Sequence, residues 1–319
     1  MLFAYAPHGQ KLLQLPHGAD LAQAVWVDLY RPMPQQVDKV RDLGVDVPTL
    51  ADMEEIEVSN RLYRENGMDY LTVVLPGLSE TKAPLSGPVC FILQPDRLVT
   101  VRHHAPRPFE TYPERADKVG PGCGDPRRLF LSLVEEIIGR LADLLEGSGR
   151  ALDAVMARVF ADGADASDTA LQQALREVAR ESDLVSRVRL SLLTMERAIS
   201  YFGQSLDDGA DGKGLRPIVK GLMRDIQALE VHGDFLTSRV AMASDVTLGM
   251  VNLVQNKTVK IVSVVAVIFL PPTVIASAYG MNFARMPELQ WDWGYPMALG
   301  LMLASAVLTY LFFKWKRWL

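Results

Sequence analysis

The sequence predicts an α+β protein with membrane helices: an N-terminal cytoplasmic α/β domain, a long helical stalk and two C-terminal transmembrane helices. Strand-like and helix-like segments alternate within residues 1–125, helical periodicity dominates residues 126–258, and two long apolar runs lie within residues 259–319. These three ranges are the predicted domains. A chain of 319 residues is long enough for its non-membrane part to bury real cores.

Short apolar segments separated by turn residues predict the first domain. β-branched and aromatic residues favour strands, and a tight Pro-Asp turn joins the last two of them. The helices are predicted from apolar residues at helical spacing and from stop signals such as Gly44. The predicted strands are residues 11–15, 24–30, 70–75, 89–93 and 98–101, and the predicted helices are residues 32–44 and 47–57.

The pattern changes at "PGCGDP" (121–126), after which nearly every segment has helical spacing. A second helix is predicted from about Ser167 to Ser205, and a glycine-rich stretch, "DDGADGKG" (207–214), separates it from the next segment. No cluster of Pro or Gly then interrupts the chain from Pro217 to Pro271. A helix from Pro217 to Tyr279 would be about 95 Å long, which predicts a stalk that continues into the membrane.

The two apolar runs, residues 261–279 and 294–313, contain no Asp, Glu, His, Lys or Arg. Each spans roughly 28–30 Å as a helix, which is the thickness of a bilayer core. We therefore predict membrane helices at 259–279 and 294–313, a periplasmic loop at 280–293 and a basic cytoplasmic tail at 314–319. The alternative, a pair of buried helices in a soluble core, is disfavoured by two uninterrupted runs of this length.

Lys and Arg gather at the outer ends of these runs, whereas the loop has one base and two acids. This asymmetry predicts a multi-pass membrane protein with both termini in the cytoplasm. No basic segment followed by an apolar one begins the sequence, so no signal peptide is expected. The flanking bases are Lys257, Lys260, Lys314, Lys316 and Arg317, and the interfacial aromatic residues are Trp291, Trp293, Tyr295, Trp315 and Trp318.

Charge and composition exclude several classes of function. Residues 259–319 carry a net +3 and the whole chain −5, so residues 1–258 carry −8. No basic surface with interleaved aromatics and no Gly-rich phosphate loop is present, so neither nucleic acid nor a nucleotide is expected as a partner. Cys90 and Cys123 have no metal-site spacing and fit a reducing cytosol. His103 and His104 suggest a metal pair, but we favour a structural role because adjacent strand residues face opposite ways.

The segments "YGMNF" (279–283), "MPEL" (286–289) and "GYP" (294–296) complete a specific pattern around the membrane helices. With the stalk and the acidic domain, the chain resembles the CorA family of magnesium transporters. The resemblance implies a homopentameric funnel whose first membrane helix lines the pore. It also implies a transporter, not an enzyme, with no cofactor, whose partners are its own copies, membrane lipid, and Mg²⁺, Co²⁺ and Ni²⁺ as transported ions.

By resemblance, Gly280, Met281 and Asn282 form the outer selectivity site. Mg²⁺ gives up its water reluctantly, and a ring of neutral amides can bind those waters weakly enough for the ion to leave again. We expect Gly280 to let the backbone turn and Met281 to fill apolar space behind it. A simpler interpretation, compatible with the first, is a helix stop in which Gly and Asn adopt left-handed backbone.

Residues at 3–4 spacing predict a pore-lining face below Asn282 without any charge. Thr273 offers a hydroxyl to a hydrated ion, and apolar side chains offer constrictions that gate by dewetting. The family often has methionine and leucine at the inner gate, where this chain has Val259 and Val262, so the strength of this gate is open. The alternative is ordinary helix packing. The predicted face is Asn256, Val259, Val262, Ala266, Leu270, Thr273 and Ser277.

Two consecutive prolines interrupt the hydrogen bonding of the first membrane helix. Pro271 and Pro272 lack the N–H groups that would bond the carbonyls of Val267 and Ile268. Free carbonyls at membrane depth need a partner or a wet cavity, so they mark a lined pore or a simple kink. Both interpretations stay open.

Acidic residues continue towards the cytoplasm. Asp234, Asp245 and Asn256 are eleven residues apart, almost three turns, and therefore share a stripe of the stalk. We expect Asp245, and less strongly Asp225 and Asp234, to bind regulatory Mg²⁺ between subunits, so that loss of the ion loosens the ring. The alternative is a solvated helix face.

Glu288 and Asp292 are expected to concentrate cations at the outer mouth, although Arg285 stands where relatives commonly carry an acid. The apolar runs provide no intramembrane proton relay, which favours a channel driven by the membrane potential. A zinc-transporting relative of the same fold and a membrane-tethered sensor or scaffold are the two alternatives. The former typically departs from Gly-Met-Asn at the middle residue, and the latter leaves Asn282 unexplained.

Overall fold

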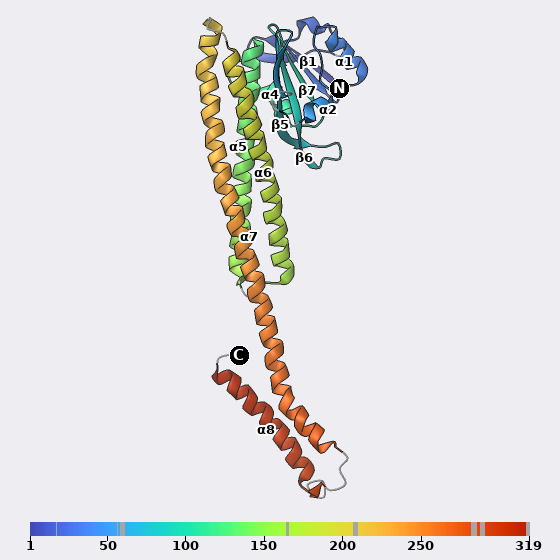
Figure 1. Cartoon of the computed structure of the whole chain (residues 1–319), viewed down its shortest axis with the longest axis vertical. Coiled ribbons are helices and arrows are strands. Elements are labelled where there is room, and N and C mark those ends of the chain that lie inside the picture. The colour runs from blue at the N-terminus through green and yellow to red at the C-terminus, as the bar shows by residue number, and fades with distance from the viewer. Residues whose placement is uncertain are drawn as a thin grey trace. The chain divides into compact units, whose positions relative to one another are not determined.

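The computed structural model describes residues 1–16, 18–55, 57, 61–163, 166–206, 210–281, 286–287 and 291–316 (Figure 1). The chain divides into two compact units, one made of Met1–Val155 with Arg176–Ala243 and the other of Met156–Leu175 with Ser244–Leu319. The first unit holds the α/β domain and most of the long soluble helices. The second holds the apolar helices.

A seven-stranded sheet in the order β2-β1-β3-β7-β6-β5-β4 organises the first unit. Only β3 and β7 pair in parallel within this sheet, and every other neighbouring pair is antiparallel. The strands are β1 (Leu2–His8), β2 (Lys11–Gln14), β3 (Trp26–Tyr30), β4 (Leu62–Glu65), β5 (Met68–Leu78), β6 (Pro84–Leu93) and β7 (Leu98–Arg102).

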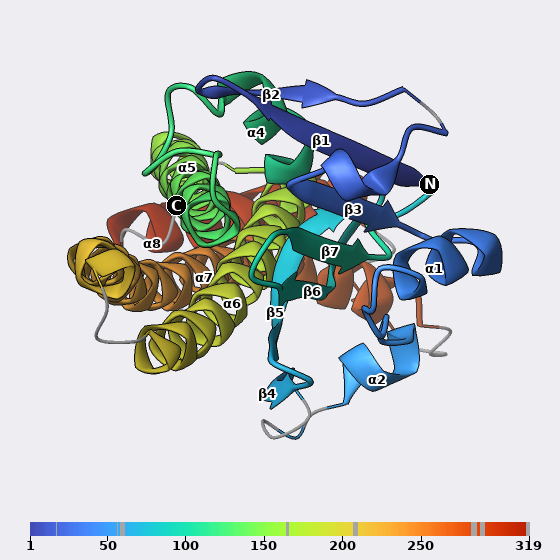
Figure 2. The same cartoon turned by 90° about the horizontal axis from the view of Figure 1, so that it is seen from above.

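Helices cover both faces of this sheet, as Figure 2 shows from above. On one face, side chains such as Val27, Ile92 and Val99 form a core with Val40 of α1 (Pro34–Arg41) and Met53 of α2 (Leu50–Glu54). The other face packs aromatic rings against α4 (Pro108–Arg115), α5 (Pro126–Asp162) and α6 (Asp168–Ser205). The ring contacts run Trp26–Tyr112, Trp26–Phe109, Phe91–Phe109, Phe91–Phe130 and Phe130–Phe202.

A buried ion pair joins the two parallel strands. Arg102 on β7 donates from Nε and Nη2 to the carboxylate of Asp28 on β3, the shortest distance being 2.8 Å. Thr100 donates to the same carboxylate at 2.8 Å and accepts from the Trp26 indole at 3.0 Å. Since every oxygen of Asp28 has a partner, the buried charge is compensated, and the network pins the register of β3 on β7.

The sequence predicted the strands at β2, β3, β5, β6 and β7, and missed β1, β4 and the short helix α4. β1 alternates weakly between apolar and polar residues, and β4 has only four residues, so neither has a clear period of two. The backbone N–H of Gln94 donates to the backbone carbonyl of Arg97 at 2.9 Å, which closes the predicted Pro-Asp turn between β6 and β7.

The long helix α7 spans Ala210–Tyr279, and α8 spans Gly294–Trp315. We predicted the start of the long helix at about Pro217, but it begins inside the glycine-rich stretch. Leu215, Val219, Leu222 and Ile226 are all buried at helical spacing, so tertiary packing outweighs the low helix propensity of the neighbouring glycines.

Candidate functional site

The C-terminal part of α7 and the whole of α8 are long and apolar enough to cross a membrane. Within the most apolar window of each helix, only 6% and 11% of the residues are buried. A helix in the core of a soluble protein would be mostly buried, so these exposed apolar surfaces need lipid or other subunits to cover them.

Each of these helices has one covered side. On α7, Val264 is only 3% exposed, and Ile268, Pro271, Pro272 and Ile275 are half-buried at the same helical spacing. The covered positions of α8 recur in the same way, and Figure 1 draws the two helices next to one another in opposite directions. They are Gly294, Met297, Ala298, Met302, Ser305, Ala306, Thr309 and Phe313.

The predicted pore face lies on the uncovered part of α7. All seven of its residues, from Asn256 to Ser277, are exposed in the single chain. Val259, Val262 and Leu270 expose 63%, 62% and 62% of their surface. No described residue of this chain therefore covers the predicted pore face, which we expect to face the other copies.

The hydroxyl of Thr273 donates to the Phe269 carbonyl of its own helix at 2.7 Å. Its proton is therefore engaged, while the lone pairs of its oxygen stay available as acceptors. The water molecules around a hydrated Mg²⁺ present O–H donors to their surroundings, so an accepting oxygen is the complementary group. Thr273 can thus contact the hydration shell without displacing it.

The glycine at the end of α7 lies in a turn, as we expected, but its backbone is not left-handed. Gly280 is absent from the positive-φ positions of the described backbone, so it is not a left-handed cap. Its N–H donates to the Ala276 carbonyl at 2.9 Å, and a Cβ atom at this position would lie 3.1 Å from that carbonyl oxygen. Glycine here relieves crowding at the last turn. Met281 is 48% exposed, so the described residues of this chain cover it only in part.

Three residues of the predicted outer site lie outside the described residues: Asn282, Arg285 and Glu288. Asp292 is described and exposed, in the turn that precedes α8. Trp291 and Trp293, on either side of it, expose 60% and 77% of their surface, as expected of aromatic residues at a membrane interface.

The helix assignment of α7 continues through Pro271 and Pro272. Both prolines lack an N–H, so the carbonyls of Val267 and Ile268 lose their usual partners four residues along the helix. The helix therefore supplies two acceptors at membrane depth without a break in its path. This is compatible with a wet lining and with a local bend.

The three stalk acids have different surroundings. Asp234 forms an ion pair with Arg189 of α6 at 2.6 Å. Asp225 faces α5, where burial and then the charge of Asp225 raise the pKa of Glu135. Asp245 is exposed, and no ion pair or hydrogen bond of its side chain occurs among the described residues. Of the three, only Asp234 has an oppositely charged partner among the described residues.

Sequence reasoning missed Arg189. No local signal could have found it, because it comes from a different helix and belongs to no recognisable motif. Burial raises the pKa of Glu230, and the charges of Glu196 and Asp234 add to this effect. The charge of Arg189 opposes these effects, so this arginine lies close to a cluster of carboxylates on α6 and α7.

The histidine pair has a structural environment. His104 is 2% exposed and its Nε2 donates to the Leu75 carbonyl at 2.9 Å, whereas the backbone carbonyl of His103 accepts from Arg31 at 2.7 Å. Burial lowers the pKa of His104 to about 4. Within the described ranges, no group of three or more His, Cys, Asp or Glu side chains could hold a metal ion.

Comparison with known proteins agrees with this arrangement. The model of the family described as CorA-like Mg²⁺ transporter protein matches residues 22–317. The magnesium transport proteins CorA of Yersinia pseudotuberculosis and Pasteurella multocida are each 34% identical to this chain, and each alignment covers all of both chains.

Solved structures share the fold. The complete CorA magnesium transporter of Methanocaldococcus jannaschii has a TM-score of 0.73 at 17% identity and covers 100% of this chain, with 99% of its own chain covered. The ZntB cytoplasmic domain from Vibrio parahaemolyticus has a TM-score of 0.53 at 12% identity, covering 76% of this chain and 94% of its own. Identities this low show the fold alone. The family match and the full-length relatives decide the matter: this chain belongs to the CorA-like Mg²⁺ transporter family, whose members are membrane transporters and not enzymes.

Proposed function

We propose that this protein takes up Mg²⁺ through a channel-like pore formed by several copies of α7, and that it also passes Co²⁺ and Ni²⁺. The observation that supports this most directly is the uncovered, charge-free face of α7 from Asn256 to Ser277 in a member of this family. Two helices cannot enclose a pore, so several chains must contribute. From the resemblance to the family we propose a homopentamer in the inner membrane with both termini in the cytoplasm.

The membrane potential is sufficient to drive this transport. A divalent cation that moves inward across 100 mV gains about 4.6 kcal/mol, twice the value for a single charge. This energy supports an inward gradient of roughly 10³-fold. Neither apolar run contains an ionisable residue other than tyrosine, so no proton relay is needed or provided.

In this proposal Asn282 and its neighbours Gly280 and Met281 select hydrated ions at the outer end. Below them Thr273 accepts hydrogen bonds from the hydration shell, and Val259 and Val262 close the inner end by excluding water. The apolar rings form a barrier only when they are close together, so a small movement of α7 opens or closes the pore.

Cytosolic Mg²⁺ provides feedback in the same proposal. Five copies of Asp245 brought together would repel one another unless a divalent cation lay between them. Bound Mg²⁺ therefore stabilises the closed pore. When the cytosolic Mg²⁺ concentration is low, the ion dissociates and the pore can open. Asp225 and Asp234 contribute less. Asp234 already has Arg189 as a partner, and Asp225 faces α5 of its own chain.

Radiotracer flux into proteoliposomes that contain the purified full chain tests this function. An inside-negative potential is imposed, and Mg²⁺, Co²⁺, Ni²⁺ and Zn²⁺ are supplied separately. The proposal expects saturable Mg²⁺ uptake that rises with the potential and needs no proton gradient. Uptake of Zn²⁺ alone would assign the chain to the zinc-transporting alternative, and no uptake of any ion would favour a membrane-tethered sensor.

A further inference from the structure

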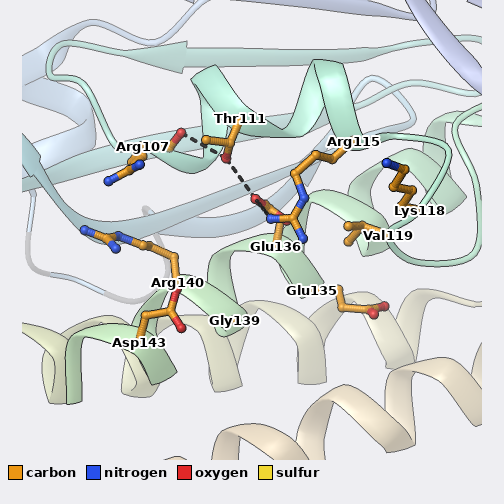
Figure 3. A pocket seen from close by; sticks show the side chains of 10 residues that line it. All are labelled: Arg107, Thr111, Arg115, Lys118, Val119, Glu135, Glu136, Gly139, Arg140 and Asp143. Atoms are coloured by element: carbon orange, nitrogen blue, oxygen red, sulfur yellow. Dashed lines mark hydrogen bonds and ion pairs between the residues drawn. The ribbon is translucent and has the colours of Figure 1, made fainter. Parts of the chain in front are cut away.

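A charged pocket of about 550 Å³ lies in the first unit, between α4 with the segment after it and the first half of α5 (Figure 3). Four of its lining residues are basic, namely Arg107, Arg115, Lys118 and Arg140, and three are acidic. Residues 1–258 carry a net −8 overall, so this pocket is a local reversal of the domain's charge. Nothing in the proposed pore uses it.

The middle of the pocket is internally neutralised. Glu136 is buried and accepts hydrogen bonds from Thr111 at 2.8 Å and from Arg115 at 3.0 Å. One acid and one base are therefore already paired. The remaining acids are Glu135, at the opposite end of the pocket from Arg140 in Figure 3, and Asp143.

The end of the pocket formed by Arg107 and Arg140 is compensated only in part, because Figure 3 shows one acid there, Asp143 beside Arg140. Figure 3 shows the two guanidinium groups at the same end of the pocket, one from the start of α4 and one from α5. In the described part of the chain, neither side chain has an ion pair or a hydrogen bond, and Arg140 is half-buried. The two bases at this end outnumber its one acid, so it keeps a net positive charge that an added anion can neutralise.

We propose that this end of the pocket binds a small oxyanion that carries at least two negative charges, of the phosphate or polycarboxylate class. The planar fork of an arginine matches two oxygens of such an anion, and two forks from different helices can hold it from two sides. No aromatic side chain is among the described lining residues, so the pocket offers no stacking surface for a nucleobase. The anion would bridge α4 and α5, and the site is independent of transport.

Isothermal titration calorimetry on the full chain in uncharged nanodiscs tests the site, in Mg²⁺-free buffer at constant ionic strength. Inorganic phosphate and citrate are the probes, and chloride is the monovalent reference. We expect saturable binding of phosphate, citrate or both, and a loss of affinity of at least about tenfold in the Arg107→Gln, Arg140→Gln double variant. Binding of only one of the two probes identifies the class of the natural anion.

Arg150→Gln is the matched control, because Arg150 is an exposed arginine on α5 that pairs with Glu146 away from the pocket. It is expected to bind as the unmodified protein does. Absence of saturable binding of both anions up to tens of millimolar would overturn the proposal. Equal affinity of the double variant and the unmodified protein would overturn it as well.

Discussion

Arg189 of α6 lies 2.6 Å from Asp234 of the stalk helix α7, measured from Nη2 to Oδ1. The pair is partly exposed, so it contributes little to stability. Its significance is electrostatic, because it neutralises one of the three stalk acids that the sequence offers as regulatory ligands. Asp245, eleven residues further along α7, has no such partner among the described residues, which makes the two acids distinguishable by experiment.

The first prediction concerns this difference. Mg²⁺ should protect the stalk of the unmodified protein from proteolysis, and Asp245→Ala should weaken that protection and flatten the dependence of flux on cytosolic Mg²⁺. The sign of the flux change is not predicted, because the variant loses both the ligand and the repulsion. Limited proteolysis and flux are measured over a Mg²⁺ series.

Asp234→Ala is the control for that experiment, since Arg189 already compensates the charge that it removes. Its response to Mg²⁺ should stay close to that of the unmodified protein. If the Mg²⁺ dose–response of Asp245→Ala is unchanged for both protection and flux, Asp245 is only a residue of a solvated helix face and not a regulatory ligand.

The second prediction concerns selectivity. Asn282→Ala should abolish or sharply reduce Mg²⁺ flux while the oligomer stays intact, because a methyl group cannot hydrogen-bond a hydrated ion. Gln255→Ala removes an amide from an exposed position of α7 outside the predicted pore face and should leave flux unchanged. Wild-type flux from a correctly assembled Asn282→Ala protein would refute the role of the amide.

The third prediction concerns the inner gate. Val262→Ser places a polar group on an exposed position of the predicted face, so it should favour wetting and raise basal flux several-fold at high cytosolic Mg²⁺. Val267→Ser, about 140° around the same helix, is the matched control and should have little effect. If basal flux of Val262→Ser equals that of the control, Val262 does not lie at the gate.

The fourth prediction concerns the soluble domain. Burial, more than the nearby charge of Arg102, lowers the pKa of His104 to about 4 from an ordinary value of 6.5. As the pH falls, His104 therefore binds a proton at a higher pH in the unfolded chain than in the folded chain. The stability that this group contributes is present above about pH 6.5 and is lost as the pH falls towards 4. The loss is roughly 3 kcal/mol when complete.

Hydrogen exchange of the sheet amides in the full chain measures this effect at a series of pH values. His104→Gln keeps a donor for the Leu75 carbonyl but does not titrate, so its sheet should lose less stability between pH 6.5 and 4. His232→Gln, at an exposed position of α7, is the control and should follow the unmodified protein. Parallel pH profiles of His104→Gln and the unmodified protein would contradict the prediction.

The family, the two membrane helices and the continuous helix that enters the membrane could all be predicted from the sequence. These features depend on hydropathy and on short-range periodicity, which local sequence carries. The exposed face of α7 was predictable for the same reason, since Val259, Val262 and Leu270 recur at helical spacing. The role of Gly280 was not, because the sequence could not distinguish a left-handed cap from a crowded last turn.

Tertiary structure alone decided which distant side chains meet. The Asp28–Arg102 pair joins residues 74 positions apart, and the Arg189–Asp234 pair joins different helices. These contacts form only when the sheet and the helices pack, so no local sequence pattern predicts them. The same applies to the start of α7, where burial of Leu215 and Val219 outweighs glycine propensity, and to Arg107 and Arg140, which α4 and α5 bring to one end of a pocket.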